Sequence, residues 1–389
     1  MAFTGGNAVG MKQMNKTAVL QLLLEKAPLT KAEIASYAEL TFATVSNLVS
    51  EMQADDLIVE LGYAESHGGR KPVLYSLNPN AFAFIGIDLQ VEKIVCALTN
   101  FEGALVYSEA IPYQVEDGPY KAVQSIRTLV NQVMSETDTL FSKIRGIGVS
   151  APGPIDNQAG IIISPPNMPG WRNVPFRDLL VQEFQIPCYL EKDANAAALG
   201  ELRYGAGKDV SDLVYIMVDV GIGGGIIIDN HIYRGFLNGA GEIGHMMIDA
   251  NGPPCNCGCN GCLEAVASGI VIEREARREL GTPVRLEQLL QQGFGRYPFM
   301  REHLAKAGQY LGIAVANLCN ALNPPLVILG GEVVDESDLY FEQACEKARE
   351  RILPDFAQRI QIVRAKLGGL SGAIGAATFV FQSTFYQTL

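Results

Sequence analysis

The stretch Gly241–Glu264, GEIGHMMIDANGPPCNCGCNGCLE, combines one histidine, four cysteines and two glutamates in a single segment. Three of the cysteines follow the spacing Cys255-x-Cys257-Gly-x-x-Gly-Cys262, and His245 lies ten residues before Cys255. Three thiolates and one imidazole complete the tetrahedral ligand set of zinc. The sequence therefore predicts a zinc ion on these four side chains, and because no coordination position stays open, the zinc is expected to be structural.

Other assignments of the cysteines remain open. Cys259 lies inside the same loop and could compete as a ligand, although the spacing favours Cys262. A disulfide is disfavoured because the cysteines are crowded. The remaining cysteines lie in apolar contexts that suit reduced, buried thiols: Cys96, Cys188, Cys319 and Cys345.

The composition is that of a globular protein with more than one domain. The chain has 389 residues, of which 48% are hydrophobic and 19% charged. Its net charge of −12 excludes a wholly basic surface for nucleic acid but not a local basic contact. No apolar run is long enough to span a bilayer, and the first residues lack the pattern of a secretory signal. We therefore expect a cytoplasmic protein.

Residues 1–80 are expected to form a winged helix-turn-helix. Apolar residues at helical spacing predict helices over about 11–26 and 41–54. Between them, Thr30 and Glu33 form a capping box that begins a short helix ending near Ala38. Two β-type runs follow, at 57–61 and 73–77, and the loop between them predicts the wing.

A module of this kind places its third helix in the major groove of DNA. Thr44, Ser46 and Asn47 are then the candidates for contacts with bases and phosphates, while Arg70 and Lys71 in the wing are candidates for phosphates or the minor groove. The six basic residues of this segment stand against eight acidic ones, which would equally suit a helical module that docks another protein.

Residues 81–389 are expected to form two α/β lobes with a ligand cleft between them. We expect a first lobe over 81–199, completed by the C-terminal helix 372–389, and a second lobe over 200–371. The predicted strands are 84–89, 93–99, 104–111, 144–150, 213–220, 225–228 and 327–329, and the predicted helices are 120–135, 270–280, 301–322, 339–352 and 372–381.

Several motifs together resemble the ROK family of repressors, open reading frames and kinases. The resemblance covers residues 11–381 and is carried most specifically by Glu242-Ile-Gly-His245 with the cysteine motif and Leu-Glu264. Further matches are APGPI from Ala151, PNMPGW from Pro166, EKDANA from Glu191, GIGGG from Gly221 and SGAIGA from Ser371. The resemblance implies an actin-like ATPase fold and either sugar phosphorylation or sugar-responsive repression of the xylose-repressor or N-acetylglucosamine-repressor type.

The resemblance also implies a sugar site on five side chains: Asn167, Asp193, Glu242, His245 and Glu264. Carboxylates accept hydrogen bonds from vicinal hydroxyls, and His245 would bind zinc through one ring nitrogen and face the sugar through the other. Taken singly, Asp193 could instead cap a helix, and Glu242 and Glu264 could be surface residues.

The phosphate-binding turns of the family's kinases are degraded. Their Asp-x-Gly-Gly-Thr turn corresponds to Asp88–Glu92 here, which has lost both glycines, and their Gly-Thr-Gly turn corresponds to Asp219–Gly221. Bulky and acidic side chains at these turns disfavour phosphate. Asp193 matches the catalytic base and is expected to be vestigial. Its neighbour, an asparagine in the kinases, is Lys192, which could hold Asp193 in an ion pair or indicate an altered sugar pocket.

We therefore expect a transcriptional regulator, most simply a repressor, with no enzymatic activity. Its partners would be operator DNA and a sugar effector, and it would act as a homodimer or a dimer of dimers because operators share the protein's two-fold symmetry. The alternatives are a sugar kinase that uses ATP and a repressor controlled by docking of a transport protein.

Overall fold

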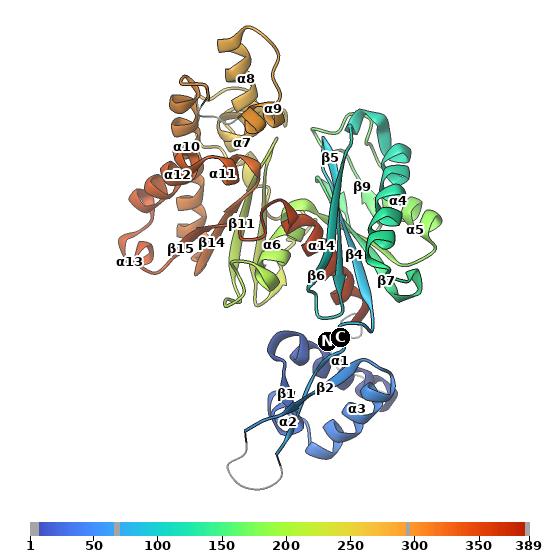
Figure 1. Cartoon of the computed structure of the whole chain (residues 1–389). Helices are drawn as coiled ribbons and strands as arrows, with labels where there is room; N and C mark the ends of the chain where they lie inside the picture. The colour runs from blue at the N-terminus through green and yellow to red at the C-terminus, as the bar shows by residue number, and fades with distance from the viewer. Residues whose placement is uncertain (1–7, 66–70, 293–295, 386–389) are drawn as a thin grey trace.

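A computed structural model describes residues 8–65, 71–292 and 296–385 (Figure 1). A small module of helices and strands comes first along the chain. Two five-stranded sheets follow, each flanked by helices, and two further helices lie between the sheets. The mixed α/β architecture agrees with the expected fold class.

The N-terminal module has the elements of a winged helix-turn-helix. Its helices are α1 (Ala8–Lys26), α2 (Lys31–Tyr37) and α3 (Phe42–Ala54), and its antiparallel sheet has the order β1 (Leu29–Thr30), β3 (Val73–Leu77), β2 (Ile58–Tyr63). The capping box is present: Thr30 accepts from the Glu33 amide, and Glu33 accepts from the Thr30 amide at 2.7 Å. Strand β1 was not anticipated, because two residues are too few to show a β period.

The first large sheet has the order β10-β7-β4-β5-β6. Strands β4, β5 and β6 form an antiparallel meander, while β7 and β10 add in parallel. Their bounds are β4 (Ala83–Leu89), β5 (Lys93–Asn100), β6 (Leu105–Pro112), β7 (Ile144–Ala151) and β10 (Cys188–Lys192). Helices α4 (Gly118–Thr137) and α5 (Phe176–Phe184) cover one face, and α14 (Ser371–Phe385) covers the other (Figure 1).

The second large sheet has the order β13-β12-β11-β14-β15. Its strands are β11 (Leu213–Val218), β12 (Ile222–Ile228), β13 (His231–Ile232), β14 (Leu326–Gly330) and β15 (Gln361–Arg364). Asp229 and Asn230 make the expected hairpin turn, both at positive φ. One face shares a hydrophobic core with α10 (Met300–Leu322) and α12 (Asp338–Arg351), and α6 (Asp193–Tyr204) covers the other. Shorter helices complete this part: α7 (Leu263–Ala267), α8 (Gly269–Leu280), α9 (Leu286–Gln292), α11 (Glu332–Glu336) and α13 (Pro354–Ala357).

Helices α6 and α14 pack against each other between the two sheets (Figure 1). Their backbones touch at glycines: a Cβ on Gly375 would lie 1.7 Å from the carbonyl oxygen of Ala196. The buried carboxylate of Glu201 on α6 accepts from the Ser371 hydroxyl at 3.0 Å and from the Leu367 amide at 2.8 Å. The expected lobe boundary at 199/200 falls inside α6, which is one continuous helix on the second sheet.

The C-terminal end of α14 shares a hydrophobic cluster with the N-terminal module and with the start of the first sheet. Phe381 and Phe385 contact Phe82, Phe84 and Phe101 in one aromatic cluster. The Thr17 hydroxyl of α1 donates to the Phe385 carbonyl at 2.8 Å. Helix α14 therefore touches the first sheet, α6 and the N-terminal module. Within the described residues, no helix combines the length and apolar character needed to cross a membrane.

Candidate functional site

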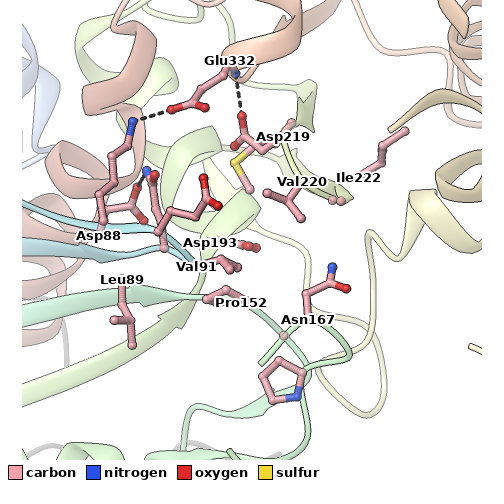
Figure 2. Close-up of a pocket in the computed structure, with 18 of the residues that line it drawn as sticks. Asp88, Leu89, Val91, Pro152, Asn167, Asp193, Asp219, Val220, Ile222 and Glu332 are labelled. Atoms are coloured by element: carbon pink, nitrogen blue, oxygen red, sulfur yellow. Dashed lines mark hydrogen bonds and ion pairs between the residues drawn. The ribbon is translucent and has the colours of Figure 1, made fainter. Parts of the chain in front are cut away.

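A cavity of about 410 Å³ lies between the two large sheets, beyond the ends of β4 and β11. All five residues predicted to contact a sugar line it: Asn167, Asp193, Glu242, His245 and Glu264. Figure 2 shows Asp88, Asp219 and Glu332 grouped at one end, Asn167 at the other and Asp193 between them. We call the first end the donor half and the second the acceptor half, after the positions of nucleotide and sugar expected from the kinase turns.

Asp193 is the first residue of α6 and faces the cavity. One of its carboxylate oxygens accepts from the Ala194 amide at 2.6 Å. The N-cap position belongs to Lys192, so capping does not account for Asp193. Burial raises the pKa of Asp193 to about 7, although the Ala194 amide and the charge of Lys192 oppose the shift. At neutral pH this carboxyl group is balanced between its charged and neutral forms.

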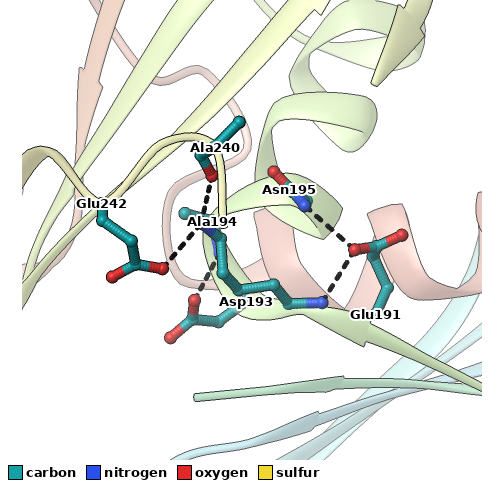
Figure 3. Close-up of polar contacts among 7 residues, drawn as sticks. Glu191, Asp193, Ala194, Asn195, Ala240 and Glu242 are labelled. Carbon is teal, nitrogen blue, oxygen red and sulfur yellow. Dashed lines mark hydrogen bonds and ion pairs between the residues drawn. The ribbon is translucent and has the colours of Figure 1, made fainter. Parts of the chain in front are cut away.

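Lys192 does not pair with Asp193. Its Nζ donates to the Ala240 carbonyl at 2.7 Å and to Glu242 Oε1 at 3.3 Å (Figure 3). The side chain is only 5% exposed. The suggestion that an ion pair depresses the basicity of Asp193 was wrong on both counts: the partner is Glu242, and the pKa of Asp193 is raised because burial outweighs the charge of Lys192.

Glu264 is buried and holds the start of β12. Its Oε2 accepts from the Ile222 amide at 3.0 Å. A Cβ on Gly221 would lie 2.6 Å from this oxygen, so the glycine is needed for the close approach. Glu242 differs, because its side chain is 47% exposed while its Oε1 contacts Lys192. Of the two glutamates, only Glu242 matches the surface alternative in its exposure.

The residues predicted to bind metal come together in one cluster. The ligand atoms of His245, Cys255, Cys257 and Cys262 all lie within 4.8 Å of one another, so the cluster could hold a metal ion. Cys257 Sγ lies 3.6 Å from Cys262 Sγ, far longer than a disulfide of about 2.05 Å. Bonds of about 2.3 Å to a tetrahedral ion would place two sulfurs about 3.8 Å apart. Cys259 is exposed and lies outside the cluster.

The loop round this cluster depends on two glycines. Gly258 has φ +92° and Gly261 φ +71°, a region that side chains disfavour. A Cβ on Gly261 would lie 1.7 Å from the Asp249 carbonyl oxygen. His245 ends the 3₁₀ turn Ile243–His245, and its Nδ1 lies 3.8 Å from Cys255 Sγ. Because His245 also lines the cavity, the metal cluster and the cavity share this side chain.

Charged side chains of the chain line the donor half and pair with one another. Asp88 accepts from Gln90 at 2.6 Å and from Ser150 at 2.7 Å. Lys93 forms an ion pair with Glu332, and the Glu332 amide donates to Asp219 Oδ1 at 2.5 Å (Figure 2). Burial and the charge of Glu332 raise the pKa of Asp219 to about 7.

Sequence reasoning missed Lys93 and Glu332. Burial lowers the pKa of Lys93, but Glu332, Asp219 and Asp88 outweigh it, and the pKa is raised overall. The two partners are 239 residues apart and belong to β5 and α11. No local pattern marks such a pair, because a lone lysine or glutamate beside a strand is a common surface feature.

The predicted DNA-contacting residues differ in exposure. Asn47 on α3 and Lys71 in the wing are exposed, and Arg70 lies outside the described residues. Thr44 and Ser46 are half-buried: the Thr44 hydroxyl bonds the N-cap Thr41 at 2.8 Å, and Ser46 Oγ lies 3.5 Å from Lys31 Nζ. Of the three predicted contact residues on α3, Asn47 is therefore the exposed one.

Comparisons with known proteins identify relatives that are named as repressors and relatives that are named as sugar kinases. The ROK family model matches residues 84–383, which begin after the N-terminal module. The xylose repressor of Caldicellulosiruptor bescii is 34% identical over 97% of this chain and 98% of its own length. A glucokinase of Halalkalibacterium halodurans is 33% identical over 77% of this chain and 95% of its own. The solved structure of a ROK family transcriptional regulator, a homologue of the E. coli MLC protein, is 25% identical with a TM-score of 0.79 over 98% of both chains. On these matches, the chain belongs to the ROK family.

Proposed function

We propose that the protein is a transcriptional repressor of carbohydrate genes, and that a sugar in the cavity controls its affinity for operator DNA. The observation that carries the proposal is the combination of a winged helix-turn-helix with a cavity whose donor half is lined by acidic side chains. The relatives named as repressors match along nearly the whole chain, including this module. Residues 1–80 would bind DNA, and the remainder would bind the sugar.

The acceptor half supports a sugar ligand. Asp193, Glu242 and Glu264 offer carboxylate oxygens, and Asn167 offers an amide, to a ring of hydroxyl groups. A few convergent polar groups in a concave site are typical of small-molecule recognition. The relatives named xylose repressors make D-xylose the first sugar to test.

The donor half supports a protein without kinase activity. Val91 and Glu92 line the cavity where the kinase turn has small residues, and Glu92 is held by Arg285 at 2.7 Å. ATP would bring its phosphates against Asp88, Asp219 and Glu332. Backbone amides and cations stabilise transferring phosphate, whereas carboxylates repel it.

For the metal cluster we propose zinc, bound by His245 Nδ1 and the thiolates of Cys255, Cys257 and Cys262. Three sulfurs and one nitrogen suit zinc and close its coordination sphere. The ion would fix the orientation of His245, whose Nε2 would then be free to bind a sugar hydroxyl.

Helix α14 could carry a movement from the cavity to the N-terminal module, because it contacts both. Near its start, Gly372 lies against Asp88 of the cavity lining, and its last turns lie against α1. We propose that sugar binding moves the two sheets relative to each other, that α14 carries this movement to the N-terminal module, and that a dimer thereby loses its fit to two half-sites.

The test is a gel-shift titration with the DNA upstream of the protein's own gene. The full chain should retard this DNA, and D-xylose or another sugar of a panel should release it. Retarded complexes that persist with every sugar would contradict control by a free sugar. In parallel, the protein is incubated with ATP and each sugar, with the H. halodurans glucokinase as positive control. Turnover to sugar phosphate would overturn the assignment as a non-enzyme.

A further inference from the structure

We infer that the cavity binds only uncharged sugars and excludes phosphorylated sugars and sugar acids. The inference rests on the proposed function and adds the chemical class of the effector. Its basis is that carboxylates of the chain already hold two backbone amides and both lysines of the cavity lining, which would otherwise bind an anion.

The first such groups are backbone amides beside the glycine-rich turns. The amide of Ile222, at the start of β12, donates to Glu264 at 3.0 Å. The amide of Glu332, which follows β14 and Gly331, donates to Asp219 at 2.5 Å. Amides at turns of this kind bind phosphate oxygens when they are free. Here a carboxylate of the protein stands where an oxygen of the ligand would bind.

The second groups are the cations. Among the described residues that line the cavity, the basic side chains apart from His245 are Lys93 and Lys192. Lys93 pairs with Glu332, and Lys192 pairs with Glu242 while also donating to the Ala240 carbonyl. At the rim, Arg285 is held by Glu92 at 2.7 Å and by Gln114 at 3.1 Å. An anionic ligand would have to displace one of these carboxylates to gain a cation.

The charge of the lining opposes that displacement. Seven carboxyl groups face two lysines: Asp88, Glu92, Asp193, Asp219, Glu242, Glu264 and Glu332 against Lys93 and Lys192. A phosphate monoester carries between one and two negative charges near neutral pH. Like charges within a few ångströms repel strongly in a partly buried site. A neutral sugar meets no such penalty, because its hydroxyl groups donate hydrogen bonds to the same carboxylates.

The experiment compares neutral and anionic sugars on the full-length protein by thermal shift and by release of DNA in the gel-shift assay. The probes are D-xylose and α-D-xylose 1-phosphate, D-glucose and glucose 6-phosphate, and glucuronate. The measurements are made at pH 8, where Asp193 and Asp219 are mostly charged. We expect a neutral sugar to raise Tm and release DNA, and its charged counterpart to bind at least about tenfold more weakly.

Two variants test the cause of the exclusion. Glu332→Gln frees Lys93 and removes one charge, and Asp219→Asn removes one charge while keeping an oxygen for the Glu332 amide. Both variants should reduce, several-fold, the ratio between the affinity for the neutral sugar and the affinity for its phosphorylated counterpart. Asp209→Asn makes the same charge change at an exposed residue outside the cavity. This control should leave the affinity ratio unchanged.

The possible outcomes separate this inference from the proposed function. A phosphorylated sugar that binds as tightly as its neutral counterpart, or alone releases DNA, would overturn the inference and leave the sugar-controlled repressor intact. An affinity ratio that stays unchanged in both Glu332→Gln and Asp219→Asn would also overturn the inference, because the carboxylates would then not cause the exclusion of charged sugars. If no sugar of either class binds, the proposed function fails, and the inference fails with it.

Discussion

At the scale of single residues, the raised pKa of Asp193 gives sugar binding a pH dependence. The groups that act on this carboxyl are the Ala194 amide, Lys192, Asp88 and Glu242. Sugar hydroxyls bond the carboxylate more strongly than the neutral acid, so binding should lower the pKa of Asp193 and release a proton. We expect affinity to rise between pH 6 and pH 8, several-fold overall.

Calorimetry in two buffers of different ionisation enthalpy measures both the affinity and the proton release of this reaction. Asp193→Asn should bind sugar more weakly at pH 8 and lose the pH dependence. An affinity that stays flat between pH 6 and pH 8 in the wild-type protein would show that Asp193 does not receive the sugar.

Asp219 predicts a pH dependence of stability. Its pKa in the folded protein is about 7, against an ordinary value of 3.8, so the folded state binds more protons than the unfolded state between these values. The contribution of Asp219 to stability is therefore present at low pH and is lost as pH rises towards 7. Asp219→Asn stays neutral throughout and should raise Tm by about 2 °C or more at pH 8.

This gain in Tm should shrink as the pH is lowered towards 5, where the wild-type carboxyl becomes protonated. Differential scanning calorimetry at several pH values measures it. Asp209→Asn, at an exposed position, should show no such trend. A gain that is equal at pH 5 and pH 8 would mean that the effect comes from packing and not from charge.

At the scale of elements, the metal loop between the 3₁₀ turn and α7 offers a matched pair of cysteines. Cys257 and Cys259 are both exposed and flank Gly258, but only Cys257 belongs to the cluster. Cys257→Ser should lose bound zinc and lower Tm, since structural zinc contributes directly to folding. Cys259→Ser should keep the bound zinc and the Tm of the wild-type protein. Elemental analysis and thermal unfolding with and without a chelator check these outcomes, and equal metal content in the two variants would contradict the ligand set.

The crossing of α6 and α14 offers a second matched pair. Gly375 lies on the Ala196 carbonyl, whereas nothing lies within 4 Å of a Cβ placed on Gly369, just before α14. Gly375→Ala should force the helices apart and destabilise the protein by about 1–3 kcal/mol or more. Gly369→Ala should change stability little. Denaturant unfolding measures both, and equal stability would mean that the helices adjust without cost.

At the scale of the whole molecule, DNA binding should depend on the exposed face of α3. Asn47→Ala removes a side chain that can donate to and accept from base edges, and loss of one such contact costs about 1–3 kcal/mol. We expect operator affinity to fall about tenfold in gel-shift titrations while sugar binding stays unchanged. Asn131→Ala, exposed on α4, is the control. Unchanged operator affinity in Asn47→Ala would place the DNA contact elsewhere.

Two ion pairs also join the halves of the molecule across the cavity. Lys93 and Glu92 belong to the part built on the first sheet, while their partners Glu332 and Arg285 belong to the part built on the second. The movement proposed above would have to break these pairs or leave them intact. Together with α14, they link the cavity lining to both sheets and to the N-terminal module.

The sequence by itself determined most of the elements and the grouping of His245 with three cysteines. Hydrophobic periodicity and the Thr30–Glu33 capping box depend on neighbours within a few residues, and most expected helices and strands agree with the structure to within a few residues. The cysteine spacing likewise brings its ligands together because short loops with glycine close on themselves. Strand β1 was missed because two residues carry no period. Strands β10 and β15 and helices α5 and α6 were not predicted either.

Only the tertiary structure decided which charged side chains form ion pairs with each other. Lys192 pairs with Glu242 and not with its neighbour Asp193, and Lys93 reaches Glu332 from a distant part of the chain. The same holds for α14, whose apolar sequence predicts a buried helix but not that it joins three parts of the molecule. Local sequence fixes what an element is, because its backbone hydrogen bonds and period are local. The direction of a long charged side chain depends on burial and on which opposite charge the fold brings within reach, and these are properties of the assembled chain.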